Sequence, residues 1–141
     1  MDEFTTFLGN HYLLTSAWLV VAILIVLSYI QSAASGSKNL TPQQAISLMN
    51  KDEALVVDVR SAAEYRKGHI LGAINIALDK LEEKNVVLEK KQEGPIIIVC
   101  PNGLQSGTAV LKLKKLGYKN VHKLNGGLQT WKAENMPVHT A

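Results

Sequence analysis

The chain has 141 residues, a formal net charge of +3 and a single cysteine. This length suits one ordinary domain, and one cysteine excludes an intramolecular disulfide framework and favours a reducing compartment. The basic residues are scattered among glutamates, which argues against nucleic-acid binding. The four histidines, at positions 11, 69, 122 and 139, are isolated, so we expect no metal site and no cofactor.

The first feature along the chain is an uncharged apolar run, residues 12–30 (YLLTSAWLVVAILIVLSYI). About 20 such residues in a helix span the ~30 Å core of a bilayer. The run therefore predicts a transmembrane helix in contact with lipid, preceded by a short tail, 1–11. A buried core helix and a cleaved signal peptide are the alternatives. The length of the run and the acidic start Asp2-Glu3 favour an uncleaved anchor.

Basic residues predict how this helix is oriented. Lys38 and Lys51 follow the run, and no Lys or Arg precedes it. By the positive-inside rule the N-terminus faces outward and the rest of the chain lies in the cytoplasm. A small-residue linker, 31–37 (QSAASGS), leads to a domain predicted to span 38–141, held close to the plasma membrane.

Helix-like and strand-like patterns alternate through this domain. Capping patterns predict helices after Thr41, running to about Asn50, and after Ser61. Apolar β-branched runs predict strands at 55–59, 72–76, 95–100 and 121–124. Further helices are predicted over 78–91, as one or two surface helices, and over 106–116 and 127–135. The alternation predicts an α/β fold with a mostly parallel sheet and helices on both faces.

Cys100 stands at the carboxyl end of the strongest strand pattern, where parallel sheets bind ligands. The segment that follows it, 100–106 (CPNGLQS), leads directly into a helix, and Gly103 permits a positive φ. Backbone N–H groups in such a loop, with the helix N-terminus, form an anion-binding nest. These donors favour a thiolate or a persulfide anion. The alternative is that Cys100 is a small buried hydrophobe.

Four motifs, in this order, resemble those of the rhodanese-like sulfurtransferase family. They are V-D-V-R at 57–60 followed by Glu64-Tyr65, G-H-I-L-G-A-I-N-I at 68–76, C-P-N-G-L-Q-S at 100–106 and G-G-L-Q-T-W at 126–131. The resemblance covers almost everything after Lys38 and implies a three-layer rhodanese-like domain. Together with the apolar run, the chain looks like a bacterial, single-pass, inner-membrane-anchored form of this family.

The resemblance also implies roles for individual residues. Cys100 would carry a persulfide, and the substrate would be bound by Pro101, Asn102, Gly103, Leu104, Gln105 and Ser106. Asp58 and Arg60 would support the site, with a structural ion pair the favoured interpretation. His69 is expected to fix a turn and Trp131 to pack in the core. The implied partners are a sulfur donor (thiosulfate or a persulfide), a thiol acceptor, and membrane or cytosolic proteins.

One departure from the family pattern bears on the donor. Gln105 stands where the family often has arginine, whose permanent charge binds oxyanions. Recognition of the thiosulfate dianion should weaken, so a persulfide on a protein or a small thiol is an equal candidate. No arginine follows Cys100, which argues against phosphatase activity.

Three functions remain open. The first is a sulfurtransferase at the cytoplasmic face of the membrane, acting through Cys100. The second is a binding or scaffold module that recruits partners to the membrane. The third is a thiol redox sensor.

Overall fold

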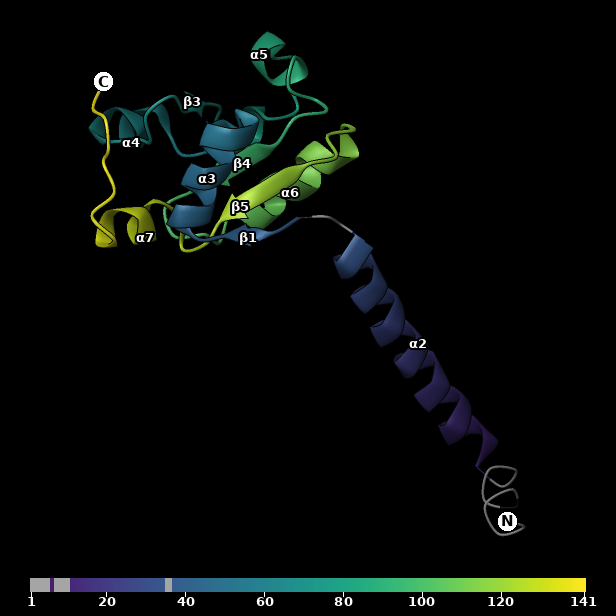
Figure 1. The fold of residues 1–141 in the computed structure, drawn as a ribbon. Coiled ribbons are helices and arrows are strands. Elements are labelled where there is room, and N and C mark those ends of the chain that lie inside the picture. Colours follow the sequence, from purple (N-terminus) through teal and green to yellow (C-terminus); the bar gives the residue numbers. More distant parts are fainter. Residues whose placement is uncertain (1–5, 7–10, 35–36) are drawn as a thin grey trace. The chain divides into compact units, whose positions relative to one another are not determined.

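The computed structural model describes Thr6, residues 11–34 and residues 37–141. The chain divides into two compact units, Met1–Ser35 and Gly36–Ala141. Figure 1 shows the helix of the first unit and the α/β arrangement of the second.

The first unit contains helix α2 (Tyr12–Ala34). Its stretch Tyr12–Ile30 has 19 residues and a mean hydropathy of 2.5, and among the described residues it is the one helix long and apolar enough to cross a membrane. The helix continues through residues 31–34, which the sequence assigned to the linker, because the Gln, Ser and Ala residues there are compatible with a helix. The predicted tail 1–11, apart from Thr6 and His11, and linker residues 35–36 lie outside the described residues.

The second unit is built on one sheet of five strands in the order β1-β5-β4-β2-β3. The strands are β1 (Asn39–Leu40), β2 (Leu55–Asp58), β3 (Ile74–Asn75), β4 (Ile96–Val99) and β5 (Val121–Leu124). Every pair is parallel, which confirms the predicted sheet type. The two-residue β1 was not predicted, because so short a strand has no sequence pattern.

Helices connect the strands, and side-chain caps begin three of them. They are α3 (Pro42–Asp52), α4 (Ala62–Lys67), α5 (Val86–Glu89), α6 (Ser106–Lys115) and α7 (Gly127–Ala133), with a 3₁₀ turn, η1 (Leu78–Lys80). Thr41 and Gln44 form the predicted reciprocal box at the start of α3. Ser61 caps α4, but the Glu64 carboxylate lies 3.4 Å from its hydroxyl and not on its backbone N–H, so only half of the second box forms.

The segment predicted as one or two surface helices, 78–91, contains two short helices, η1 and α5, which cover only part of it. Leu81 and Leu88 are each only 1% exposed. Burying each of these leucines contributes about 1.5–3 kcal/mol, which holds the segment against the core. Asn85 has an extended backbone, and its side chain caps the start of α5, so the two helices stay separate.

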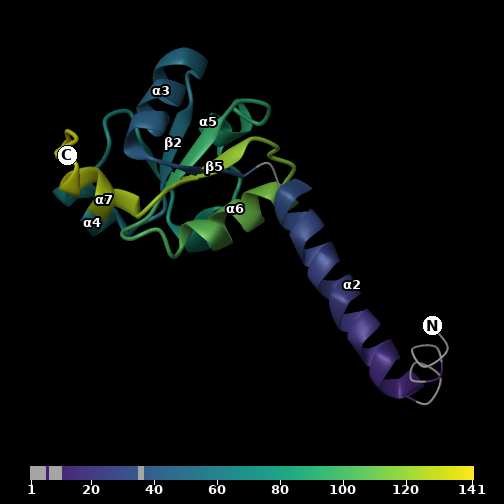
Figure 2. The same ribbon diagram turned by 60° about the horizontal axis from the view of Figure 1, so that its bottom comes forward.

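Two apolar clusters cover the two faces of the sheet. On one face Val57, Ile98 and Val121 pack against Ala109 and Leu113 of α6. On the other face Val56, Ile97 and Leu124 pack against Ala45 of α3 and Trp131 of α7. Figure 2 shows α3 and α6 on opposite sides of the strands. The domain therefore has the predicted three layers, and Trp131 is the predicted core residue, 2% exposed.

Candidate functional site

Cys100 follows β4 directly, at the carboxyl end of a central strand. Its side chain is completely buried. The sulfur accepts two hydrogen bonds, from the backbone N–H of Gly103 at 2.9 Å and from the hydroxyl of Ser106 at 2.9 Å. Since both donors point at one sulfur, the loop is arranged to stabilise negative charge there.

The other residues of the 100–106 loop shape its turn, line a groove or point into solvent. The Asn102 side-chain oxygen accepts a hydrogen bond from the N–H of Leu104 at 3.2 Å and so fixes the turn. Gly103 has a φ of +89°, which an L side chain rarely adopts. Leu104 is 80% exposed. Pro101 and Gln105 line an adjoining groove. The structure thus brings Gly103 and Ser106 to the sulfur and directs Leu104 away into solvent.

A turn at the start of α7 supports the backbone of this loop. The N–H of Leu128 donates to the carbonyl of Cys100 at 2.9 Å, and the N–H of Gln129 donates to the carbonyl of Pro101 at 3.0 Å. Gly127 has a φ of +61°, and a Cβ there would lie 2.2 Å from the Cys100 carbonyl oxygen. Sequence reasoning matched this glycine only to a family motif and missed its contact. The signal was the glycine pair ahead of the final helix.

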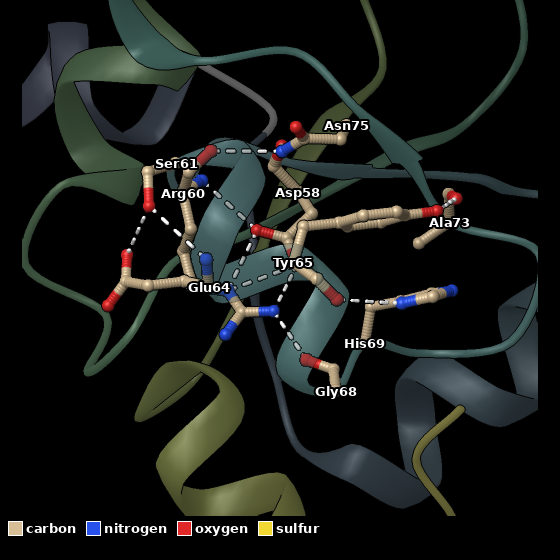
Figure 3. A network of polar contacts seen from close by, with 9 residues as sticks. All are labelled: Asp58, Arg60, Ser61, Glu64, Tyr65, Gly68, His69, Ala73 and Asn75. Atoms are coloured by element: carbon tan, nitrogen blue, oxygen red, sulfur yellow. Dashed lines mark hydrogen bonds and ion pairs between the residues drawn. The ribbon is translucent and has the colours of Figure 1, made fainter. Parts of the chain in front are cut away.

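Asp58 and Arg60 form a buried ion pair in a network of polar contacts (Figure 3). Arg60 Nη2 lies 2.6 Å from Asp58 Oδ2, and Arg60 Nε contacts both carboxylate oxygens. Nη2 also donates to the carbonyl of Gly68 at 2.7 Å. The Asn75 amide donates to the carbonyls of Asp58 and Arg60. The structure thus contains the ion pair that the sequence interpretation favoured.

The turn after α4 is fixed by an aromatic pair. His69 Nδ1 lies 2.9 Å from the carbonyl oxygen of Tyr65, and the two rings stack with centroids 3.8 Å apart. The Tyr65 hydroxyl donates to the carbonyl of Ala73. Figure 3 shows these two hydrogen bonds, from His69 to Tyr65 and from Tyr65 to Ala73, beside the ion pair. The predicted role of His69 in fixing a turn is confirmed.

A groove of about 640 Å³ runs beside the cysteine loop. Its walls come from the end of β2, the start of α4, η1, the loop itself and α6. Its charged and amide-bearing lining residues are Arg60, Glu64, Asp79, Gln105 and Lys112. The groove gives a small polar ligand a place beside the loop that holds Cys100.

Shifted pKa values occur at groups that do not line this groove. Burial lowers the pKa of His122 below its ordinary value, and the charges of Lys38 and Lys114 lower it further. Burial also lowers the pKa of Lys114 and raises that of Tyr118. Among the described residues, no group of three His, Cys, Asp or Glu side chains could hold a metal ion.

Fold and site together define a single α/β domain with a cysteine-centred, anion-stabilising loop at the carboxyl edge of a parallel sheet. Residues 41–134 match the model of the rhodanese-like domain. The chain belongs to the rhodanese-like family, and both the predicted family and the predicted fold are confirmed.

Individual relatives extend the comparison. The chain is 35% identical over 139 residues to the uncharacterised protein YibN of Escherichia coli K12, covering 98% of this chain and 97% of YibN. It is 32% identical over 98 residues to the thiosulfate sulfurtransferase GlpE of Coxiella burnetii, covering 70% of this chain and 90% of GlpE. A solved rhodanese-related protein of Thermoplasma volcanium superposes with a TM-score of 0.64 at 27% identity, covering 74% of this chain and 99% of its own. These relatives support a function of the sulfurtransferase type.

Proposed function

We propose that this protein is a membrane-anchored sulfurtransferase that carries sulfane sulfur as a persulfide on Cys100. The observation that supports this most directly is the pair of donors on the cysteine sulfur, the Gly103 N–H and the Ser106 hydroxyl, both at 2.9 Å. Donors that stabilise a thiolate also stabilise the anion of a persulfide. One loop can therefore stabilise both the thiolate and the persulfide of Cys100 during a transfer cycle.

The transfer has two halves. In the first, the Cys100 thiolate attacks the sulfane sulfur of a donor, and the donor leaves as its desulfurated anion. In the second, an acceptor thiolate attacks the outer sulfur of the Cys100 persulfide, and the Cys100 thiolate leaves. Each half exchanges one bond to the transferred sulfur for another, so no further oxidant or reductant is needed.

The surrounding residues take supporting roles in this proposal. The loop Pro101–Ser106 surrounds the transferred sulfur and contacts the substrate. The pair Asp58 and Arg60, at 1% and 6% side-chain exposure, fixes the end of β2 that forms one wall of the groove.

We further propose that α2 anchors the domain in the bacterial inner membrane. Its 19-residue apolar stretch has the length of a single span. The relative YibN matches the chain over 98% of its length, so the similarity includes this helix. Lys38 and Lys51 follow the helix, which favours an outward N-terminus and a cytoplasmic domain. Protease protection of inside-out and right-side-out vesicles tests the orientation.

Intact-mass spectrometry of the full-length protein in detergent tests the sulfur step. After treatment with a sulfane-sulfur donor, the mass should rise by one sulfur atom, and a thiol should reverse the gain. Cys100→Ser is the control and should gain nothing. An equal gain in Cys100→Ser, or no gain in the wild type with any donor, would contradict the proposal.

One observation favours a second candidate, a module that recruits partner proteins to the membrane. Leu104 is 80% exposed at the tip of the loop, so its apolar side chain is accessible to a partner protein. Partner capture that survives Cys100→Ser but is lost in Leu104→Ser would support this candidate.

A further inference from the structure

The groove beside Cys100 carries free charge of both signs. Glu64 of α4 and Asp79 of η1 are exposed lining residues. Within the described part of the chain, neither carboxylate forms an ion pair. The Glu64 carboxylate accepts a hydrogen bond from the Ser61 hydroxyl at 3.4 Å, which is visible in Figure 3. Both carboxylates therefore remain able to bind a cationic group.

Lys112 of α6 supplies the positive charge. Its side chain is 28% exposed, and its ammonium lies 3.7 Å from a Glu82 carboxylate that is 60% exposed, so this surface pair is weak. The same ammonium lies 3.5 Å from the carbonyl of Leu78. A lysine ammonium has three donors, so Lys112 is positioned by Leu78 and can still bind an anionic group.

The other cation in the groove is already neutralised. Arg60 is held by Asp58 at 2.6 Å, and Gln105 adds an uncharged amide. Two carboxylates outside any ion pair therefore accompany one ammonium, that of Lys112, which is only weakly paired with Glu82. This balance opposes the thiosulfate dianion and suits a ligand that carries both a carboxylate and an ammonium group.

We infer that the groove binds the persulfide of a zwitterionic, amino-acid-type thiol as the sulfur donor, with Lys112 holding its carboxylate and Glu64 and Asp79 holding its ammonium. The inference rests on the proposed function, since it names the donor for Cys100. A groove of about 640 Å³ lies within the range of small-molecule sites.

The transfer from such a donor, R–S–SH, balances without another reactant. The Cys100 thiolate attacks the terminal sulfur, a bond forms from Sγ to that sulfur, and the S–S bond of the donor breaks. The electron pair leaves with R–S⁻, which takes up the proton of the transferred sulfur. The products are R–SH and the Cys100 persulfide anion. The donor is reduced to a thiol as the cysteine is oxidised to a persulfide.

Three donors that differ only in charged groups test the inference. They are the persulfides of cysteine, with both charges, of 3-mercaptopropionate, with the carboxylate alone, and of cysteamine, with the ammonium alone. The rate of sulfur loading on Cys100 is measured by mass spectrometry of the full-length protein in detergent. Cysteine persulfide should load faster than either analogue by roughly fivefold to tenfold, because each analogue lacks one charge-assisted contact.

Variants assign each charge of the donor to its residue. Lys112→Gln should remove the preference for cysteine persulfide over cysteamine persulfide, and keep the preference over the mercaptopropionate persulfide. The double variant Glu64→Gln, Asp79→Asn should do the reverse. Lys119→Gln and Glu93→Gln are matched controls, since these residues form an exposed pair that does not line the groove. Ratios between donors cancel a general loss of stability.

The outcomes separate the inference from the function on which it rests. Equal loading by the three donors, or fastest loading by the anionic one, would overturn the inference and leave Cys100 as the sulfur carrier. No loading from any donor would overturn the proposed function and the inference together.

Discussion

The backbone N–H of Leu128 donates a 2.9 Å hydrogen bond to the carbonyl oxygen of Cys100. The residue proposed to carry sulfur is therefore held from two sides. Its side chain is held by its own loop, and its backbone by the start of α7. The backbone of α7 can approach the Cys100 carbonyl oxygen this closely because residue 127 is a glycine. Any other residue at this position would have a Cβ that overlaps the carbonyl oxygen.

Gly127→Ala should disrupt this support. Its φ of +61° costs a non-glycine residue about 1–2 kcal/mol, and the Cβ must also push the loop away. We expect a loss of about 1–3 kcal/mol in the free energy of unfolding and sulfur loading on Cys100 slowed by roughly tenfold. Chemical denaturation and mass spectrometry measure the two effects. The control is Gly107→Ala in α6, where a Cβ meets nothing within 4 Å. Loading at the wild-type rate in Gly127→Ala would show that the support is dispensable.

Asp58→Asn should strongly destabilise the domain. It leaves the Arg60 guanidinium, 6% exposed, without its compensating charge, and breaking a buried pair costs about 3–5 kcal/mol. Glu93→Gln breaks the Lys119–Glu93 pair, whose side chains are 74% and 75% exposed, and should cost less than about 1 kcal/mol. Urea unfolding in detergent compares the two variants. Similar losses in both would refute the structural role of the buried pair.

His122 should make stability depend on pH. Burial, then Lys38 and Lys114, lower its pKa in the folded protein below the ordinary 6.5. Its Nδ1 also accepts a hydrogen bond from the Lys38 N–H, which protonation would break. The unfolded chain therefore binds this proton at a higher pH than the folded one. The stabilising contribution is complete above about pH 6.5 and is lost as the pH falls through the lowered folded pKa.

The measurement is the urea midpoint of the full-length protein between about pH 5 and pH 7. The urea midpoint of the wild type should decrease as the pH is lowered. In His122→Gln the midpoint should depend less on pH. His139→Gln is the control, since His139 is exposed near the end of the chain. The same pH dependence of the midpoint in the wild type and His122→Gln would refute the role of His122.

Gln105→Arg should improve the use of thiosulfate. The guanidinium would add a permanent charge to the groove wall that Gln105 now lines, and arginine binds oxyanions through paired donors. We expect kcat/KM for thiosulfate to rise roughly tenfold, measured by the rate of sulfur loading on Cys100. Gln43→Arg, an exposed position on α3 outside the groove, controls for overall charge. No change in Gln105→Arg would mean that this position does not select against the dianion.

Local chemistry explains the parts of this structure that could be predicted. The apolar run Ile96–Val99 is buried at every position, so its composition predicted both a strand and a parallel sheet. The capping box at Thr41 forms as predicted, because its partners lie three residues apart. Both hydrogen bonds to the Cys100 sulfur also come from one short segment, 100–106.

The parts that could not be predicted depend on contacts between distant residues. Asp79 and Lys112 meet at one groove only because η1 and α6 pack together, and no local pattern encodes that meeting. The approach of Gly127 to Cys100 likewise appears only after β4 and β5 pair.

The pairing of the edge strand β1 with β5 determines when the domain can complete its sheet during synthesis. Asn39 pairs with Lys123 and Leu40 with Leu124, so the strand that follows α2 must wait for almost the last strand of the chain. At about 5–20 residues per second on the ribosome, this delay lasts roughly 4–17 s. The apolar helix thus leaves the ribosome well before its domain can close. For the membrane anchor proposed above, insertion would precede the completion of the fold, and the nascent domain would mature while already tethered.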